Sequence, residues 1–250
     1  MINPDAFDLL ALDRVIESYD YENDLLLQEE FRPIETALWT LIENYASGSN
    51  DFGQQMSQHL RRTSIDGMRF MVDELGFSEK AGRNFHAANL FQDLGKIHPA
   101  YDPNIWDLPH RPTEAEREEK RKHPWRGTDM FQIAIEEASP ALREHPHIKT
   151  VIPAIQLFHH ERCDGNGLFG KKADELGLVI KTVCIVDTKD GDMIRRGHQN
   201  EVRDEPTALR RMKSLEAYDD KGKYDGAFDG LLDRYIAYRE RVSGQKILES

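Results

Sequence analysis

The segment LGLVIKTVCIVD, residues 176–187, decides whether the fold is all-α or contains a sheet. Its β-branched residues would suit a strand. A helix that is buried on every side shows the same continuous apolar run, so periodicity does not separate the two alternatives. The choice therefore depends on the rest of the chain.

Helical signals dominate the rest of the chain. In IETALWTLIENYA, residues 34–46, apolar side chains recur at the spacing of one helical face. The next predicted helix, 54–76, ends at Gly76, a typical C-cap residue. Ser78 is a typical N-cap for a helix that runs on to the motif at 90–97. Further helices are predicted at 127–138, within 148–167, and at 206–218 and 227–242.

The middle of the chain changes from loop to helix at Thr113. Residues 97–112 contain four prolines, which predicts a loop. Thr113 and Glu116 have the spacing of a capping box. They would begin a charged helix that Pro124 should end or kink at His123.

The composition limits the possible partners. The 250 residues include 45 acidic and 33 basic side chains, a formal charge of -12. Nucleic-acid polymers and anionic membranes bind basic surfaces, so we expect neither as a partner. Two cysteines, and no apolar run of about 18 residues, predict a soluble protein of the reducing cytoplasm. An anionic substrate would need a locally positive site.

Four histidines and two aspartates form a candidate set of metal ligands. Both aspartates follow apolar segments, where a carboxylate needs a cation or hydrogen bonds to offset its desolvation. Two adjacent histidines close an apolar helix and need polar partners there. The set is His59, His123, His159, His160, Asp93 and Asp187.

Each of these signals also has an ordinary structural interpretation. His59 alone could be a surface histidine, and Asp93 a carboxylate at a helix end. Lys96 could complement a helix C-terminus. The ERCDGNG segment, 161–167, could be only a turn. The set carries more information than any member.

The stretch from about residue 55 to residue 196 resembles the HD-GYP family, bacterial phosphodiesterases that open cyclic dinucleotides. NLFQDLGKI, 89–97, lies where that family has HD-x-GK, and KHPWRGTDMF, 122–131, where it has a His-Pro flanked by a basic residue. HHERCDGNGLF, 159–169, lies where the family has HHE-x-x-DG-x-GYP. VCIVDTKDGDMIRRGH supplies the family's two acids and its arginine, here Asp187, Asp190 and Arg196.

This resemblance implies an all-α fold, the helical bundle of the HD superfamily with extra N- and C-terminal helices. Residues 176–187 would then be helical. We expect an N-terminal helical extension at 1–50, an HD-GYP-like metal-binding core at 51–203, and C-terminal helices at 204–250 that pack on the core.

The resemblance also implies two divalent transition-metal ions, as iron, manganese or zinc. His59, Asp93 and Asp187 match the ligands of one ion. His123, His159 and His160 match those of the other, with Asp93 shared. Such a pair activates water and neutralises a phosphodiester under attack. Asp93 and Lys96 would be catalytic, and the substrate would contact Lys96, Arg162, Gly167 and Arg196.

The chain departs from the family in several places, among them RRGHQ, 195–199, where the family has a pattern near RPYR. Gln92 replaces the histidine of the HD pair, and an amide is a poorer ligand than imidazole, so this half of the centre should be weak or lack Gln92 as a ligand. Gln55 stands where members with three metals have a glutamate, so a third ion is not expected. Leu168 and Phe169 replace Tyr-Pro.

The resemblance predicts hydrolysis of cyclic di-GMP or a related cyclic dinucleotide in bacterial second-messenger signalling, with reduced activity. One alternative is a catalytically silent relative that binds a nucleotide or a signalling protein partner. Another is a phosphohydrolase of the HD superfamily that acts on a different nucleotide.

Overall fold

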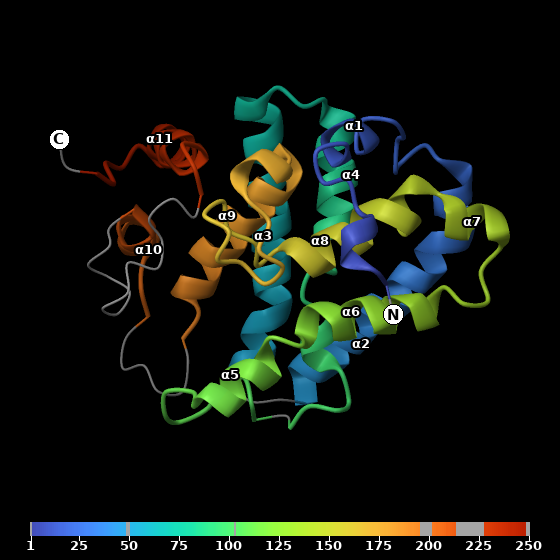
Figure 1. Ribbon diagram of the computed structural model, residues 1–250, viewed down its shortest axis with the longest axis horizontal. Helices are drawn as coiled ribbons and strands as arrows, with labels where there is room; N and C mark the ends of the chain where they lie inside the picture. Colours follow the sequence, from blue (N-terminus) through green and yellow to red (C-terminus); the bar gives the residue numbers. More distant parts are fainter. Residues whose placement is uncertain (1, 49–50, 103, 196–201, 214–227, 249–250) are drawn as a thin grey trace.

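The computed structural model describes residues 2–48, 51–102, 104–195, 202–213 and 228–248. These residues form helices and loops and contain no strand, so the predicted all-α fold is confirmed (Figure 1). One isolated antiparallel bridge joins Asp164 to Lys172. The helices are α1 Leu12–Val15, α2 Arg32–Gly48, α3 Asp51–Leu75, α4 Glu79–Asn89, α5 Glu114–Lys120, α6 His123–Ala134, α7 Pro140–Glu144, α8 Ile152–Phe158, α9 Leu178–Met193, α10 Glu205–Lys213 and α11 Leu231–Ser243, with short 3-10 or π turns η1 Pro4–Ala6, η2 Leu27–Phe31, η3 Leu94–Ile97, η4 His147–Val151 and η5 Ala173–Glu175.

The ambiguous segment forms most of helix α9. Residues Thr182 to Asp187 are buried at every successive position, because α3, α8, α10 and α1 all contact this helix. A helix enclosed in this way has no solvent face, which explains why its sequence lacks helical periodicity. The prediction that the segment is helical is confirmed.

Local capping signals define several helix ends as predicted. Gly76 ends α3 with a left-handed backbone (φ 82°), and Ser78 caps α4 by accepting a hydrogen bond from the Ala81 N–H. Thr113 and Glu116 form both hydrogen bonds of the capping box at the start of α5. These contacts span three residues or fewer, so sequence alone suffices to predict them.

Two predicted helix ends are wrong. Helix α4 ends at Asn89, and the motif at 90–97 continues as turns and η3 instead of helix. The charged helix α5 ends at Lys120, and His123 begins a new helix, α6, with Pro124 in its first turn. Proline is well tolerated there because the first turn has no intrahelical acceptor for its missing N–H.

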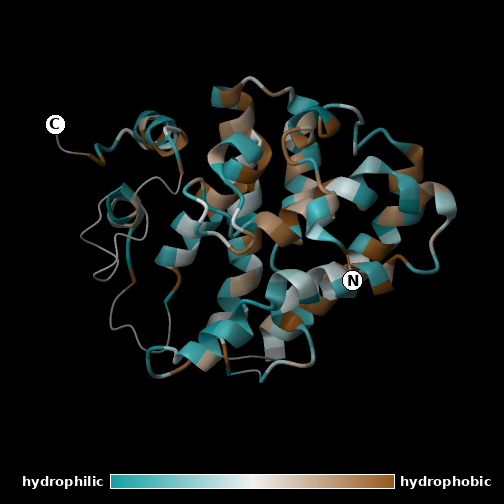
Figure 2. Ribbon diagram, in the orientation of Figure 1, coloured by the Kyte–Doolittle hydropathy of each residue, from teal (hydrophilic) through white to brown (hydrophobic). Residues whose placement is uncertain are grey.

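One hydrophobic core connects the whole described chain. Its buried residues run from Leu9 to Ile247, and they come from all three predicted segments. Helix α3 is central and contacts α2, α4, α9 and α11, while α8 packs on α4, α6 and α9 (Figure 1). Figure 2 shows hydrophobic and hydrophilic residues on different sides of many helices. Among the described helices, none has the length and apolar character needed to cross a bilayer.

A buried histidine should make folding sensitive to acid. His147 is 0% exposed, and its Nδ1 lies 2.8 Å from the hydroxyl of Tyr19. Burial, followed by the neighbouring His145, lowers the pKa of His147 to about 3. Since an unfolded histidine titrates near pH 6.5, the unfolded state binds the extra proton between pH 6.5 and pH 3. Stability is therefore lost as the pH falls through this window.

We expect His147 to contribute up to about 1.4 kcal/mol per pH unit to the fall in unfolding free energy below pH 6.5. His147→Gln keeps an acceptor for Tyr19 and does not titrate, so it should reduce this slope in urea unfolding between pH 7 and 4.5. His110→Gln, at an exposed position, is the control. Equal slopes in wild type and His147→Gln would contradict the assignment.

Candidate metal centre

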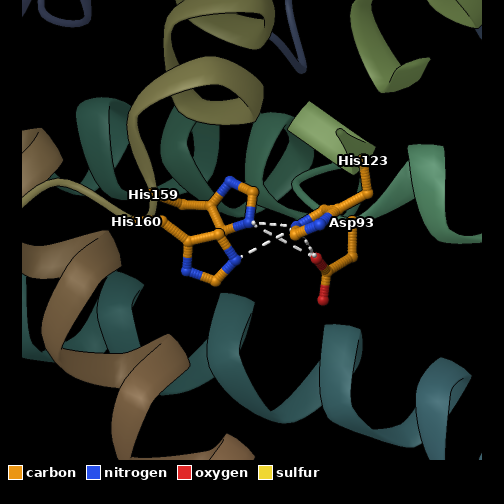
Figure 3. A group of neighbouring side chains, drawn as sticks. All are labelled: Asp93, His123, His159 and His160. Carbon is orange, nitrogen blue, oxygen red and sulfur yellow. Dashed lines mark hydrogen bonds and ion pairs between the residues drawn. The ribbon is translucent and has the colours of Figure 1, made fainter. Parts of the chain in front are cut away.

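The structure brings all six predicted ligand residues together around Asp93. The residues form two groups. Each residue of a group offers one ligand atom, and these atoms lie within 4.8 Å of one another. We call Asp93, His123, His159 and His160 the three-histidine group (Figure 3). We call His59, Asp93 and Asp187 the His59 group. These mostly buried groups could hold a metal ion.

Distant elements supply these side chains. His59 lies on α3, and Asp187 lies on α9. Asp93 precedes η3, and His123 is the first residue of α6. His159 and His160 follow α8 directly, where the apolar helix ends.

Three imidazole Nε2 atoms converge in the three-histidine group. The Nε2 atom of His123 lies 3.0 Å from that of His159 and 3.1 Å from that of His160. The Oδ1 atom of Asp93 lies 3.2 Å from Nε2 of His123 and 3.4 Å from Nε2 of His159 (Figure 3).

Main-chain carbonyls determine which nitrogen points into the group. Nδ1 of His123 lies 2.7 Å from the Lys120 carbonyl, and Nδ1 of His159 lies 2.8 Å from the Gln156 carbonyl. A carbonyl only accepts, so each Nδ1 carries the hydrogen and each Nε2 carries a lone pair. Lone pairs held 3.0 Å apart repel each other, and a shared cation relieves that repulsion. This is the usual orientation of metal-binding histidines.

The charges in the centre also suit a cation. Asp93 is fully buried, which favours protonation, but Lys96 and the facing imidazoles hold its pKa well below the usual range. Burial lowers the pKa of His123 and that of His160, whose ring is nevertheless partly open to the cleft. Asp93 is therefore anionic and these histidines neutral at pH 7, the states in which they bind metals.

The His59 group is oriented by a carboxylate and an arginine. Nδ1 of His59 lies 2.7 Å from Asp190, which accepts two hydrogen bonds from Arg62. Nε2 of His59 lies 3.2 Å from Asp187 and 3.3 Å from Asp93. Burial lowers the pKa of His59, but its hydrogen bonds to the three aspartates outweigh this and raise it to about 10. Burial raises the pKa of Asp190, but its hydrogen bonds with His59 and Arg62 outweigh this effect and lower the pKa to about 2.

Gln92 lies in the His59 group, at the position that the sequence predicted. Its side chain is 0% exposed. Nε2 donates to Oδ1 of Asp187 at 3.2 Å and lies 3.4 Å from the Thr63 hydroxyl. The amide oxygen has no hydrogen-bond partner among the described residues.

Gln55, where a third ion was not expected, accepts a hydrogen bond from the Arg195 N–H, just after the end of α9.

No protein-family model matches the chain, and neither does any curated protein. The resemblance to HD-GYP proteins therefore rests on the motif residues themselves.

A cleft of about 620 Å³ opens over both groups. Its wall includes His59, His123, His160 and Asp187 at the centre. Lys96, Lys120 and Arg121 bring positive charge to the wall, although the chain is acidic as a whole. The ammonium of Lys96 lies 2.5 Å from Oδ2 of Asp93. The cleft wall thus carries an ammonium group next to the carboxylate that both groups share.

The predicted substrate-binding residues differ in their positions. Gly167 and Lys96 line the cleft. Arg162 does not line the cleft; it forms an ion pair with Asp164, at 3.0 Å from Nε to Oδ1. Arg196 lies outside the described residues.

The two residues that replace Tyr-Pro have separate roles. Leu168 lines the cleft, where it supplies an apolar surface. Phe169 packs against Trp125 and Phe158, with ring centroids 4.9 Å apart in each pair. Phe169 is therefore part of the packing that supports the loop after His160.

Arg62 and Trp106 contribute to the site without a predicted role, and Asp190 was predicted only as one acid of a family motif. Arg62 and Asp190 lie three residues after His59 and Asp187, a helical spacing that could have revealed them. Trp106 lies in the predicted loop, where no periodic signal exists. Its Nε1 donates to the Lys96 carbonyl at 3.0 Å, and its ring meets His123 edge-on.

Proposed function

We propose that this protein is a metal-dependent phosphodiesterase of the HD-GYP type, with cyclic di-GMP or a related cyclic dinucleotide as its substrate in bacterial second-messenger signalling. The observation that carries the proposal is the convergence of three imidazole Nε2 atoms beside the Asp93 carboxylate, next to a cleft whose wall contains His123, His160 and Lys96. The donors suit iron, manganese or zinc.

Each residue has a distinct part in the proposed reaction. Asp93, His123, His159 and His160 hold an ion, which when bound supplies Lewis acidity toward a phosphoryl oxygen and activates water. Lys96 binds a phosphoryl oxygen and offsets the charge that develops there. Trp106 positions Lys96 through its main chain. The apolar wall at Leu168 offers contact to the non-phosphate part of the substrate.

The proposal predicts slow hydrolysis of cyclic di-GMP to a linear dinucleotide when Mn²⁺ or Fe²⁺ is supplied. Chromatography of the products, with a panel of other nucleotides in parallel, would test it. Asp93→Asn should remove activity, since the shared carboxylate is lost. Absence of turnover for every nucleotide and metal would contradict an enzymatic role.

Lys96→Ala should weaken binding of cyclic di-GMP by roughly 10-fold to 100-fold, because a charge-assisted hydrogen bond to phosphate is lost. Metal content should stay nearly unchanged. Isothermal titration calorimetry and elemental analysis measure both quantities. Lys122→Ala is the matched control, because Lys122 pairs with Glu119 on an exposed surface. Equal affinity of wild type and Lys96→Ala would remove Lys96 from the site.

A catalytically silent nucleotide-binding protein is the second candidate, and Gln92 is the observation that favours it. Its amide lies among the ligand atoms of the His59 group, where the family has an imidazole. Binding of cyclic di-GMP without turnover at any metal concentration would support this candidate. Turnover of a different nucleotide alone would instead support a phosphohydrolase with another substrate.

A further inference from the structure

We propose that the centre binds one metal ion, in the three-histidine group, and that Gln92 and its neighbours close the His59 group to a second ion with hydrogen donors of the chain itself. This inference rests on the metal centre of the proposed function. It concerns the number and place of the ions, so metal stoichiometry tests it without any activity assay.

The two oxygens of Asp93 have different surroundings. Oδ2 faces the Lys96 ammonium at 2.5 Å and Nε2 of His59 at 3.3 Å. Oδ1 faces Nε2 of His123 and Nε2 of His159, and it accepts no hydrogen bond from the described residues. One oxygen is thus neutralised by the protein, while the other points to lone pairs and requires a cation. Oδ2 of Asp93 is therefore closed to a metal ion, whereas Oδ1 is open to one.

The contacts of Asp187 also close the His59 group to a metal ion. Its Oδ1 accepts from the Gln92 amide at 3.2 Å and lies at the same distance from Nε2 of His59. Its Oδ2 lies 3.6 Å from Nδ1 of His160. An amide N–H is a donor and cannot bind a cation. The place where a ligand nitrogen would point therefore contains a hydrogen.

The reverse orientation of the Gln92 amide does not provide a good site either. Rotating the amide by 180° would bring its oxygen toward Oδ1 of Asp187, where two acceptors would face each other inside the protein, although the same amide position also lies 3.3 Å from Nε2 of His59. The present orientation leaves the buried amide oxygen without a partner, but it gives Asp187 a donor. The uncharged oxygen is the less costly atom to leave unpaired, because an ionised carboxylate loses more on desolvation.

Two members of the three-histidine group turn their N–H groups away from the place of the ion. The Nδ1 hydrogens of His123 and His159 go to main-chain carbonyls. Three imidazole nitrogens and one carboxylate oxygen remain, a donor set that suits four-coordinate Zn²⁺ and also Fe²⁺ or Mn²⁺. The structure thus assigns the ion to this group.

The decisive measurement uses the unaltered wild-type protein. Metal is removed with a chelator, and the protein is titrated with Mn²⁺ or Zn²⁺ by calorimetry and analysed for metal after desalting. We expect one tightly bound ion per chain. Two ions of similar affinity would overturn the inference and leave the proposed function intact. No bound ion would overturn both.

Variants locate the ion and test the part of Gln92. Gln92→His adds an imidazole ligand to the His59 group and should raise the stoichiometry to two. The double variant Gln92→His with Asp187→Asn should return it to one, because the added ion loses a carboxylate. Thr63→Ala is the matched control: it alters a buried contact of Gln92 without adding a ligand, and should keep one ion.

Circular dichroism and urea unfolding would verify that each variant is folded. The second ion of Gln92→His should persist at saturating metal, where the wild type still binds one ion. A folded Gln92→His protein that still binds a single ion would show that Gln92 does not control the His59 group, which overturns the inference.

Discussion

Replacing both His159 and His160 with alanine should abolish tight transition-metal binding by this protein. The substitutions remove two of the three imidazoles whose Nε2 atoms converge beside Asp93. Changes to residues that merely orient a ligand commonly reduce metal affinity by about 10-fold to 100-fold, so loss of two ligands should reduce it by more than 100-fold. Elemental analysis of wild type prepared without chelator should find at least one ion per chain, and the variant should contain almost none.

A matched control separates this effect from a general loss of histidine. His110→Ala removes an exposed histidine that pairs with Glu116 and belongs to neither ligand group. It should retain the wild-type metal content. Metal-free wild type, or an unchanged metal content in the double variant, would show that this cluster is not a metal centre.

Gly95→Ala should be among the most destabilising single substitutions in the chain. A Cβ atom at this position would lie 1.9 Å from the His123 carbonyl oxygen and 2.4 Å from the Gly127 nitrogen. Both are main-chain atoms of α6, so no side-chain rotation relieves the clash. Helix α6 and η3 must separate, and we expect a loss of about 3 kcal/mol or more in unfolding free energy.

The same separation should weaken the metal centre. Asp93 precedes η3 and His123 begins α6, so their contact depends on the close approach at Gly95. Urea unfolding and metal titration of the variant would measure both effects. Gly230→Ala is the control, since no atom lies within 4 Å of its added Cβ. Wild-type stability in Gly95→Ala would contradict the close packing of η3 on α6.

The functional prediction depends on residues that lie far apart in the sequence. Six ligand candidates lie between His59 and Asp187, and their spacing alone left ordinary interpretations open for each. Their assignment to two groups came from the resemblance to HD-GYP proteins. The structure contains the same two groups, which share Asp93. The substrate and the reaction remain predictions.

The sequence by itself determined the helical character of most segments and the caps at Ser78 and Thr113, because these depend on hydrogen bonds between residues a few positions apart. It also placed Gln92 beside Asp93 as a departure from the metal-binding pattern.

Only the tertiary structure decided what each polar group does in the centre. It enclosed α9 so completely that this helix carries no periodic signal. It turned Nε2 of His123 and of His159 inward by holding Nδ1 on a carbonyl, and it paired Arg162 with Asp164 away from the cleft. These outcomes depend on burial and on which groups meet across helices. A buried polar atom must find its partner in space, and the order of residues along the chain does not specify that partner.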